Sequence, residues 1–181
     1  MKKIITLTFS LLLVFISNSQ VNTKLDEKNG FKDFQIGDSY DKWKLNLTKV
    51  SGDANKIKYK YTGACCQQVF DFNVDEILLE FQSNKLINII ITLEQWEKST
   101  SENDFADLAT CFDNIDYLAG RFETLFGKHS DYEKDEETGT ITYGWFGNKI
   151  ALTCSMQYQG IRAGCKPFII LGDMSVVESG F

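Results

Sequence analysis

Histidine and proline are almost absent from this 181-residue chain, which contains one of each. The single histidine, His129, excludes any site that needs two imidazoles, and no Cys-x-x-Cys pair supplies thiolates at zinc-binding spacing. No motif identifies a serine or cysteine nucleophile that could pair with His129 in catalysis, because no Gly-x-Ser-x-Gly and no papain-like cysteine occurs. We therefore interpret His129 as a solvated residue just past a helix, where the helix dipole favours its positive charge.

Phosphate-binding and calcium-binding loops are missing as well. No Gly-x-x-x-x-Gly-Lys-Ser/Thr occurs. Asp71, Asn73 and Asp75 have the opening spacing of an EF-hand loop, but Glu76 and Gln82 stand where that loop needs glycine and glutamate. The chain has 25 acidic residues, and no spacing singles out a pair for glycoside hydrolysis. We predict no catalytic residue, no cofactor and no metal ligand.

No apolar run reaches the roughly 20 residues that a membrane-spanning helix needs. The longest run, Ile4–Ile16, follows Lys2 and Lys3 and precedes the small residues Ser17-Asn18-Ser19. This pattern is typical of a secretory signal peptide over residues 1–19, with the working protein starting near Gln20. Residues 17–22 contain no cysteine for lipid attachment. We expect a periplasmic or secreted protein with no stable membrane insertion after signal cleavage.

Positive charge is scarce in the expected mature chain. Without Lys2 and Lys3 it has 17 basic and 25 acidic residues, a net charge of −8. This charge argues against a nucleic-acid partner and against an anionic lipid surface. It favours a cationic protein partner, or it serves solubility alone. About 160 residues with a hydrophobic content of 43% over the whole chain are enough for one domain with a real core.

Cysteine is present in an odd number, and the expected export makes disulfides the default. The five cysteines allow fifteen schemes if two bridges form: Cys65, Cys66, Cys111, Cys154 and Cys165. Bonding between the adjacent Cys65 and Cys66 distorts the peptide that joins them, so we expect each to bond elsewhere or one to stay free. We predict a Cys154–Cys165 bridge across the last hairpin, which leaves Cys111 as a small buried apolar residue.

The periodicity predicts an α+β fold. Apolar residues from Phe105 to Phe126 recur at alternating spacings of three and four, which indicates one long amphipathic helix closed by Gly127. Residues 20–29 read as a flexible lead-in, residues 30–181 as a single domain, and the acidic stretch 131–137 as a solvated loop. Alternating or apolar stretches predict a mainly antiparallel sheet of six to seven strands, with residues 86–93 at its centre: 56–61, 69–74, 77–81, 86–93, 140–145, 150–158 and 167–171. Residues 30–37 suggest a further short edge strand.

Three residues are candidates for contact with a partner. Ile161 and Arg162 lie on the tip of the glycine-flanked loop 159–164, where an apolar and a cationic side chain can anchor a partner. Such a tip can equally be an ordinary flexible turn. Trp96 follows the central strand in a charged stretch, where it is either a surface anchor or a cover for the end of the sheet.

Two segments carry a resemblance to known proteins: Phe31-Lys32-Asp33-Phe34-Gln35-Ile36-Gly37-Asp38-Ser39, and Leu118 to Lys128. The first is similar to the Ile-x-x-Gly-x-Ser opening, and the second to the helix followed by Gly-Lys, of small exported domains of the β-lactamase-inhibitor-like type. Related outer-membrane-assembly lipoproteins carry a lipid-attachment cysteine that this chain lacks. The resemblance implies an α+β fold and carries over no functional residue.

These observations favour an exported, non-catalytic binding module, most simply a protein inhibitor or immunity-type protein acting in the cell envelope. Two alternatives stay open. One is an envelope hydrolase with unmarked catalytic carboxylates, and the other is a carrier of a small ligand or lipid in the aromatic-rich core.

Overall fold

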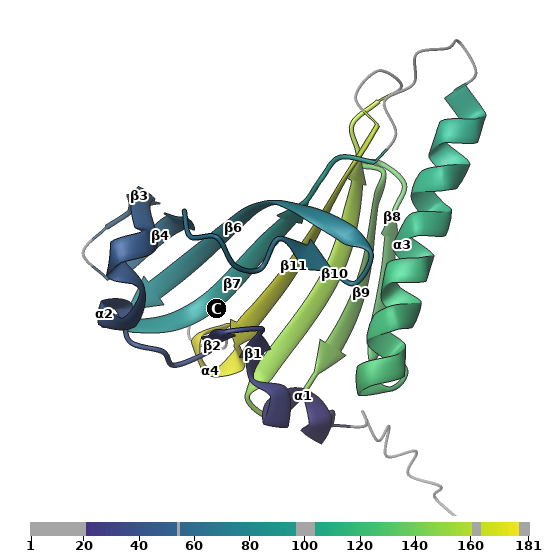
Figure 1. The fold of residues 1–181 in the computed structure, drawn as a ribbon. Coiled ribbons are helices and arrows are strands. Elements are labelled where there is room, and N and C mark those ends of the chain that lie inside the picture. The colour runs from purple at the N-terminus through teal and green to yellow at the C-terminus, as the bar shows by residue number, and fades with distance from the viewer. Residues whose placement is uncertain (1–20, 54, 97–103, 161–163, 178–181) are drawn as a thin grey trace, which may run out of the picture.

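The computed structural model describes residues 21–53, 55–96, 104–160 and 164–177, without the side chains of 104–108 and 177. The expected signal peptide therefore lies outside the described residues. The fold is α+β, as predicted, with a mostly antiparallel nine-stranded sheet and a small two-stranded one (Figure 1). No helix within the described part of the chain is long and apolar enough to cross a membrane.

The large sheet has the spatial order β3-β4-β6-β7-β11-β10-β9-β8, and the short β5 pairs with β6. The bounds of its strands are Leu47–Gly52 (β3), Lys56–Tyr61 (β4), Gln68–Val69 (β5), Phe72–Gln82 (β6), Lys85–Leu93 (β7), Asp131–Asp135 (β8), Thr140–Phe146 (β9), Ile150–Tyr158 (β10) and Cys165–Asp173 (β11). The small sheet pairs Gly30–Phe31 (β1) with Phe34–Gln35 (β2). The prediction that residues 86–93 form a central strand is confirmed, because β7 lies between β6 and β11.

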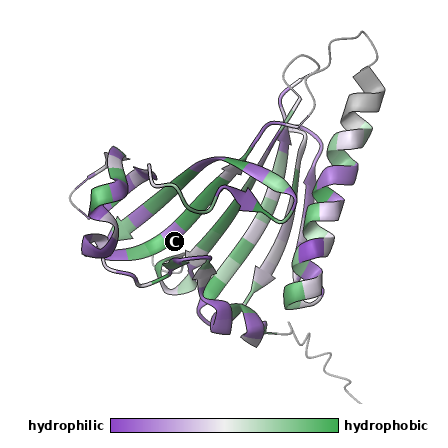
Figure 2. Ribbon diagram, in the orientation of Figure 1, coloured by the Kyte–Doolittle hydropathy of each residue, from purple (hydrophilic) through white to green (hydrophobic). Residues whose placement is uncertain are grey.

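The long helix α3, Asp104–Phe126, packs across β9, β10 and β11. Its predicted apolar stripe is confirmed in the described side chains, since Ile115, Ala119 and Phe122 are buried. Gly127 follows with a φ of 85°, the left-handed conformation that ends many helices and that glycine adopts without steric cost. In Figure 2, hydrophobic residues run along the central strands, while α3 carries hydrophilic residues on the rest of its surface.

The core lies on the face of the sheet that α3 covers. Register aligns Leu152 of β10 with Leu171 of β11, and Leu171 with Ile89 of β7, so that three buried side chains form one row across the sheet. Trp145 of β9 lies beside Leu152 and is fully buried, and its indole Nε1 donates to the Gly127 carbonyl at 2.9 Å. This bond connects the sheet to the end of α3.

Short helices flank the large sheet along the chain. Ser39 is the N-cap of α2, Tyr40–Trp43. The helix ends at Trp43, because a 3₁₀ turn over Lys44–Asn46 leads directly into β3. A final short helix, α4 (Met174–Val177), follows β11.

The prediction of a flexible lead-in over residues 20–29 is wrong. Thr23–Lys28 form helix α1, capped by the Asn22 side chain, which accepts the Leu25 N–H at 3.1 Å. Leu25 is 1% exposed in the core. The six-residue helix is held by one buried side chain and by contacts with distant turns, and neither appears as a local apolar pattern.

Two further segments differ from the sequence expectations. Residues 131–137 are not a solvated loop throughout, because Asp131–Asp135 form the edge strand β8 against β9. The two strands expected at 69–74 and 77–81 are instead the short β5 and the single long β6, separated by a tight turn at Phe70, whose φ is +50°. The sheet therefore has more strands than the six or seven expected.

The predicted Cys154–Cys165 bridge is wrong, and Cys111 is not the unpaired cysteine. Cys111 of α3 is bonded to Cys165 of β11 with a Cα–Cα distance of 6.1 Å, and Cys154 is the free, buried thiol. Register explains the difference. Cys165 faces Tyr158 across the hairpin, while Cys154 faces Ile169, so the two cysteines are four residues apart along the ladder.

Candidate functional site

The edge strand β8 concentrates negative charge at one end of the large sheet. We define the acidic edge as the five carboxylates of this strand and the turn after it: Asp131, Glu133, Asp135, Glu136 and Glu137. Lys134 is the one cation within this stretch, and its Nζ lies 3.5 Å from Glu136 Oε1. Four of the five carboxylates are exposed, and Asp135 is half-buried.

Asp135 shapes the turn that follows β8. Its carboxylate accepts the Thr138 hydroxyl at 2.7 Å and the Glu137 N–H at 2.9 Å. The Thr138 hydroxyl, the Glu137 N–H and the Thr138 N–H together lower the pKa of Asp135 below its ordinary value. The acidic edge therefore keeps this charge at neutral and mildly acidic pH.

A depression of about 260 Å³ lies beside the acidic edge. Phe112 of α3, Ile141 of β9 and Tyr158 of β10 contribute apolar or aromatic side chains to its lining, and Lys134, Asp135 and Glu136 are the charged residues that line it. The ammonium of Lys134 lies 5.9 Å from the centroid of the Phe112 ring. Aromatic and carboxylate groups together suit a cationic side chain with an apolar stem.

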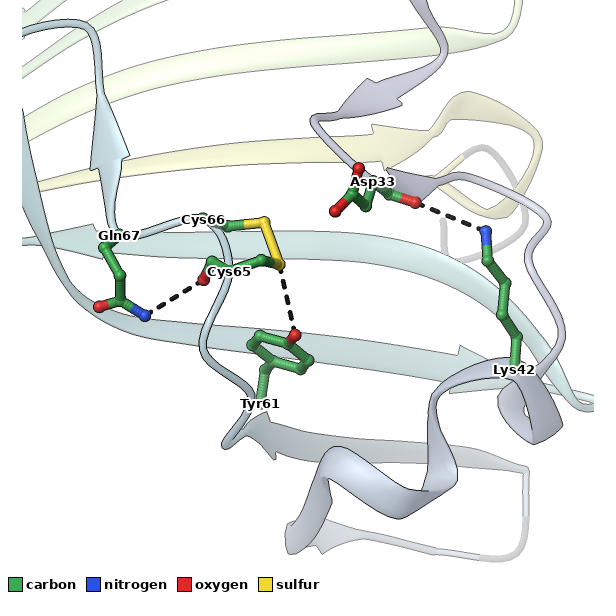
Figure 3. The surroundings of a disulfide bond; sticks show 6 residues. All are labelled: Asp33, Lys42, Tyr61, Cys65, Cys66 and Gln67. Atoms are coloured by element: carbon green, nitrogen blue, oxygen red, sulfur yellow. Dashed lines mark hydrogen bonds between the residues drawn. A yellow bond between two sulfur atoms is a disulfide. The ribbon is translucent and has the colours of Figure 1, made fainter.

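A second cluster lies in the loop between β4 and β5. The adjacent cysteines Cys65 and Cys66 are bonded to each other, with a Cα–Cα distance of 3.8 Å (Figure 3). The prediction that each bonds elsewhere or that one stays free is therefore wrong. Tyr61 Oη lies 3.3 Å from Cys65 Sγ. Gln67 Nε2 donates to the Cys65 carbonyl at 3.1 Å. Cys66 has a φ of +72°, a left-handed conformation that is uncommon outside glycine.

Asp33, from the turn between β1 and β2, completes this cluster. Its carboxylate points toward the two sulfur atoms in Figure 3, and the three possible ligand atoms lie within 4.8 Å of one another. We call Asp33, Tyr61, Cys65 and Cys66 the sulfur cluster. Its Tyr61 ring packs edge-on against Phe34 at 4.9 Å, which fixes the position of the hydroxyl.

Of the three predicted partner-binding residues, Trp96 lies within the part of the chain that the structure describes. Trp96 is 7% exposed; its ring lies 5.0 Å from that of Phe72, and its backbone pairs with Cys165. It covers the end of the sheet and is not a surface anchor in this structure. Ile161 and Arg162 lie outside the described residues, so their role stays a prediction.

His129 is half-buried, unlike the solvated residue expected from sequence. Its Nδ1 lies 2.7 Å from Glu123 Oε1, and its ring packs edge-on against Tyr143 at 5.1 Å. The Tyr143 hydroxyl donates to Asp116 Oδ1 at 2.6 Å. Burial and the bond to Asp116 raise the pKa of Tyr143, so this phenol stays neutral and donating. In the sequence, the one hint of this contact is that Glu123 and His129 lie six residues apart, on either side of Gly127, where the helix ends.

One pocket of the described residues lies in the apolar interior, and it is small. A cavity of about 40 Å³ lies between α3 and the sheet, with Ile91, Phe122 and Leu152 among its lining residues. Its volume is close to that of a single water molecule. It gives no support to the alternative of a lipid carrier.

No protein-family model matches the chain, and comparison with curated proteins and with solved structures finds no match. The resemblance to β-lactamase-inhibitor-like domains therefore stays a prediction. The geometry offers two candidate sites, the acidic edge with its adjoining depression and the sulfur cluster.

Proposed function

We propose that this chain is an exported, non-catalytic binding module that captures a cationic protein partner in the cell envelope, as an inhibitor or an immunity-type protein does. The observation that carries the proposal is the position of the depression. Its lining brings Phe112, Ile141 and Tyr158 together with the acidic residues Asp135 and Glu136, and with Lys134 of the same strand. A lysine or arginine of a partner can place its stem against the apolar and aromatic side chains and its charge against the carboxylates.

Charge supports the same proposal at longer range. An expected mature net charge of −8 attracts a cationic partner, and the acidic edge orients it toward the depression. The internal contact between Lys134 and the Phe112 ring indicates that an ammonium group is accepted there. Steering of this kind acts on the association rate and weakens as salt screens charges beyond roughly 10 Å at 0.1 M.

The first step of the test is capture. Mature protein, residues 20–181, is immobilised and exposed to an extract of the cell envelope, and a retained protein is identified, purified and tested for direct binding. Association rates are then measured at low and at physiological salt. We expect a partner of net positive charge whose association slows as salt rises.

The second step uses two variants of equal net charge. Replacing Glu133, Glu136 and Glu137 by glutamine removes three charges from the acidic edge. Because orientation depends on local charge, we expect association at low salt to slow about tenfold.

The matched control is Glu27→Gln with Asp41→Asn and Asp75→Asn, three exposed carboxylates outside the acidic edge. It removes the same total charge and should slow association much less. Equal slowing by both variants would reject the acidic edge as the binding site. Absence of any partner together with turnover of a peptidoglycan or ester substrate would replace the binding function by the hydrolase alternative.

A further inference from the structure

The sulfur cluster lies far from the acidic edge in the order of the sheet, and the proposed binding function does not use it. Three separate segments build it: Asp33 from the β1–β2 turn, Tyr61 at the end of β4, and the Cys65–Cys66 loop. Two adjacent sulfur atoms beside a carboxylate are the donor set of a metal site once the disulfide is reduced.

The two disulfides of the protein differ in access. Cys111 and Cys165 are both fully buried. Cys65 is half-buried and Cys66 is 7% exposed, so the Cys65–Cys66 pair is the more accessible of the two disulfides. Because thiol–disulfide exchange needs this access, the Cys65–Cys66 bond opens first.

We propose that Asp33, Cys65 and Cys66 form a redox-gated site for a thiophilic divalent metal ion such as Zn²⁺, closed in the disulfide form and open in the dithiol form. An external dithiol is the reductant. One of its thiolates attacks Cys65 Sγ and expels Cys66 as a thiolate. Its second thiolate then resolves the mixed disulfide and releases Cys65. Two electrons pass to the protein, and the reductant leaves as a cyclic disulfide.

Metal binding follows reduction and releases protons. Each cysteine thiol loses its proton as its sulfur bonds the ion, the Asp33 carboxylate supplies an oxygen ligand, and a water molecule fills the fourth tetrahedral position. Zinc–sulfur bonds of about 2.3 Å and zinc–oxygen bonds of about 2.0 Å place tetrahedral ligand atoms roughly 3.3 to 3.8 Å apart. The two sulfur atoms are bonded to each other in the present structure and must separate to reach this spacing. The Asp33 carboxylate lies within 4.8 Å of both sulfur atoms, which is close enough for a small movement of this exposed side chain to complete the ligand set.

Tyr61 positions the first sulfur. Its hydroxyl lies 3.3 Å from Cys65 Sγ and can donate to the thiolate, an outer-shell contact of the kind that orients metal ligands. Cys154 does not compete for the ion, because its thiol is fully buried on β10 and lies outside the cluster.

Stepwise reduction tests the gate. Mature protein is incubated with increasing dithiothreitol, alkylated after denaturation, and digested. Without reductant we expect one alkylated cysteine, Cys154. At intermediate reductant we expect Cys65 and Cys66 to be labelled as well, with the Cys111–Cys165 peptide pair still linked. Opening of Cys111–Cys165 first, or of both bonds together, would overturn the gate.

Cobalt titration of the selectively reduced protein, desalted without oxygen, tests the site. We expect one Co²⁺ per chain, with the thiolate charge-transfer and ligand-field bands of a tetrahedral site, and displacement by Zn²⁺. The oxidised protein and the Cys65→Ser, Cys66→Ser double variant should show no such bands. Asp33→Asn should weaken binding by at least about tenfold, in the range found when metal-site contacts are removed.

Asp41→Asn is the matched control, an exposed carboxylate on α2 that pairs with Lys44. It should bind cobalt as the wild type does. Equal affinity in Asp33→Asn and Asp41→Asn would remove Asp33 from the site, and bands that persist in the serine variant would overturn the proposal. Circular dichroism of each reduced protein verifies that the fold is retained, and loss of the fold on opening Cys65–Cys66 alone would also overturn it.

Discussion

The carboxylate of Asp26 accepts a hydrogen bond of 2.7 Å from the backbone N–H of Asn148, a residue 122 positions further along the chain. The same carboxylate accepts the N–H groups of Lys149 at 2.9 Å and Ile150 at 3.1 Å. The turn between β9 and β10 is thus closed by a side chain of α1. This relationship explains why a helix of six residues is ordered at the start of the fold.

Replacing Asp26 by alanine should destabilise the protein by about 2 kcal/mol, because three backbone donors lose a charged acceptor. Burial alone would raise the pKa of Asp26, but the bonds from Lys149, Asn148 and Ile150 outweigh it and lower the pKa below 3.8. The carboxylate therefore stabilises the fold above its unfolded pKa, and this contribution is lost as pH falls through the lower folded value. In urea unfolding, the free energy of unfolding should fall less between pH 7 and pH 2 in the variant than in the wild type. Glu27→Ala on the same helix is the control and should change little.

Gly147 should not tolerate alanine. A Cβ at this position would meet the Asp26 carboxylate that closes the turn, so the carboxylate would have to move away from its backbone donors. We expect Gly147→Ala to cost about 1 to 3 kcal/mol. Gly120→Ala is the matched change, because Gly120 is exposed on α3 with no neighbour within 4 Å of the added Cβ. It should stabilise the protein by up to about 1 kcal/mol. Thermal unfolding that ranks the two variants in the opposite order would contradict the closure of the β9–β10 turn by Asp26.

The Cys111–Cys165 bridge should be the main covalent contribution to stability. It joins α3 to β11 over a sequence separation of 54 residues. Replacing both cysteines by alanine should lower the free energy of unfolding by about 4 kcal/mol on the chain-entropy model. Urea unfolding measures the change, and opening only Cys65–Cys66, which closes no long loop, should cost far less. A similar loss from both would show that loop closure is not the cause.

Cys154 should be unreactive in the folded protein. The thiol is fully buried, and burial raises its pKa, so almost no thiolate is present or accessible at neutral pH. A chromogenic disulfide reagent should therefore release about zero equivalents of thiol without denaturant and about one with it, because one free cysteine is present. Rapid labelling of the native protein would place Cys154 at the surface.

The sequence by itself determined the elements whose apolar pattern is strong. The stripe that ends at Phe126 predicted α3, and the isoleucines of residues 86–93 predicted a strand in the middle of the sheet, since only a strand covered on both faces is apolar throughout. Alternation likewise located β4, β9 and β10. The negative charge of residues 131–137 follows directly from the residue types in that stretch.

Only the tertiary structure decided the rest. Residues of β8 are polar on both faces, so pairing with β9 and not periodicity makes them a strand. Which cysteine stays unpaired depended on the register of the β10–β11 hairpin, in which Tyr158 faces Cys165. No local sequence pattern reveals that register. Both candidate sites join residues far apart in the chain, Phe112 with Asp135 and Asp33 with Cys65. The packing of the sheet and helices brings these residues together. The sequence around each residue does not indicate which distant residue it will contact.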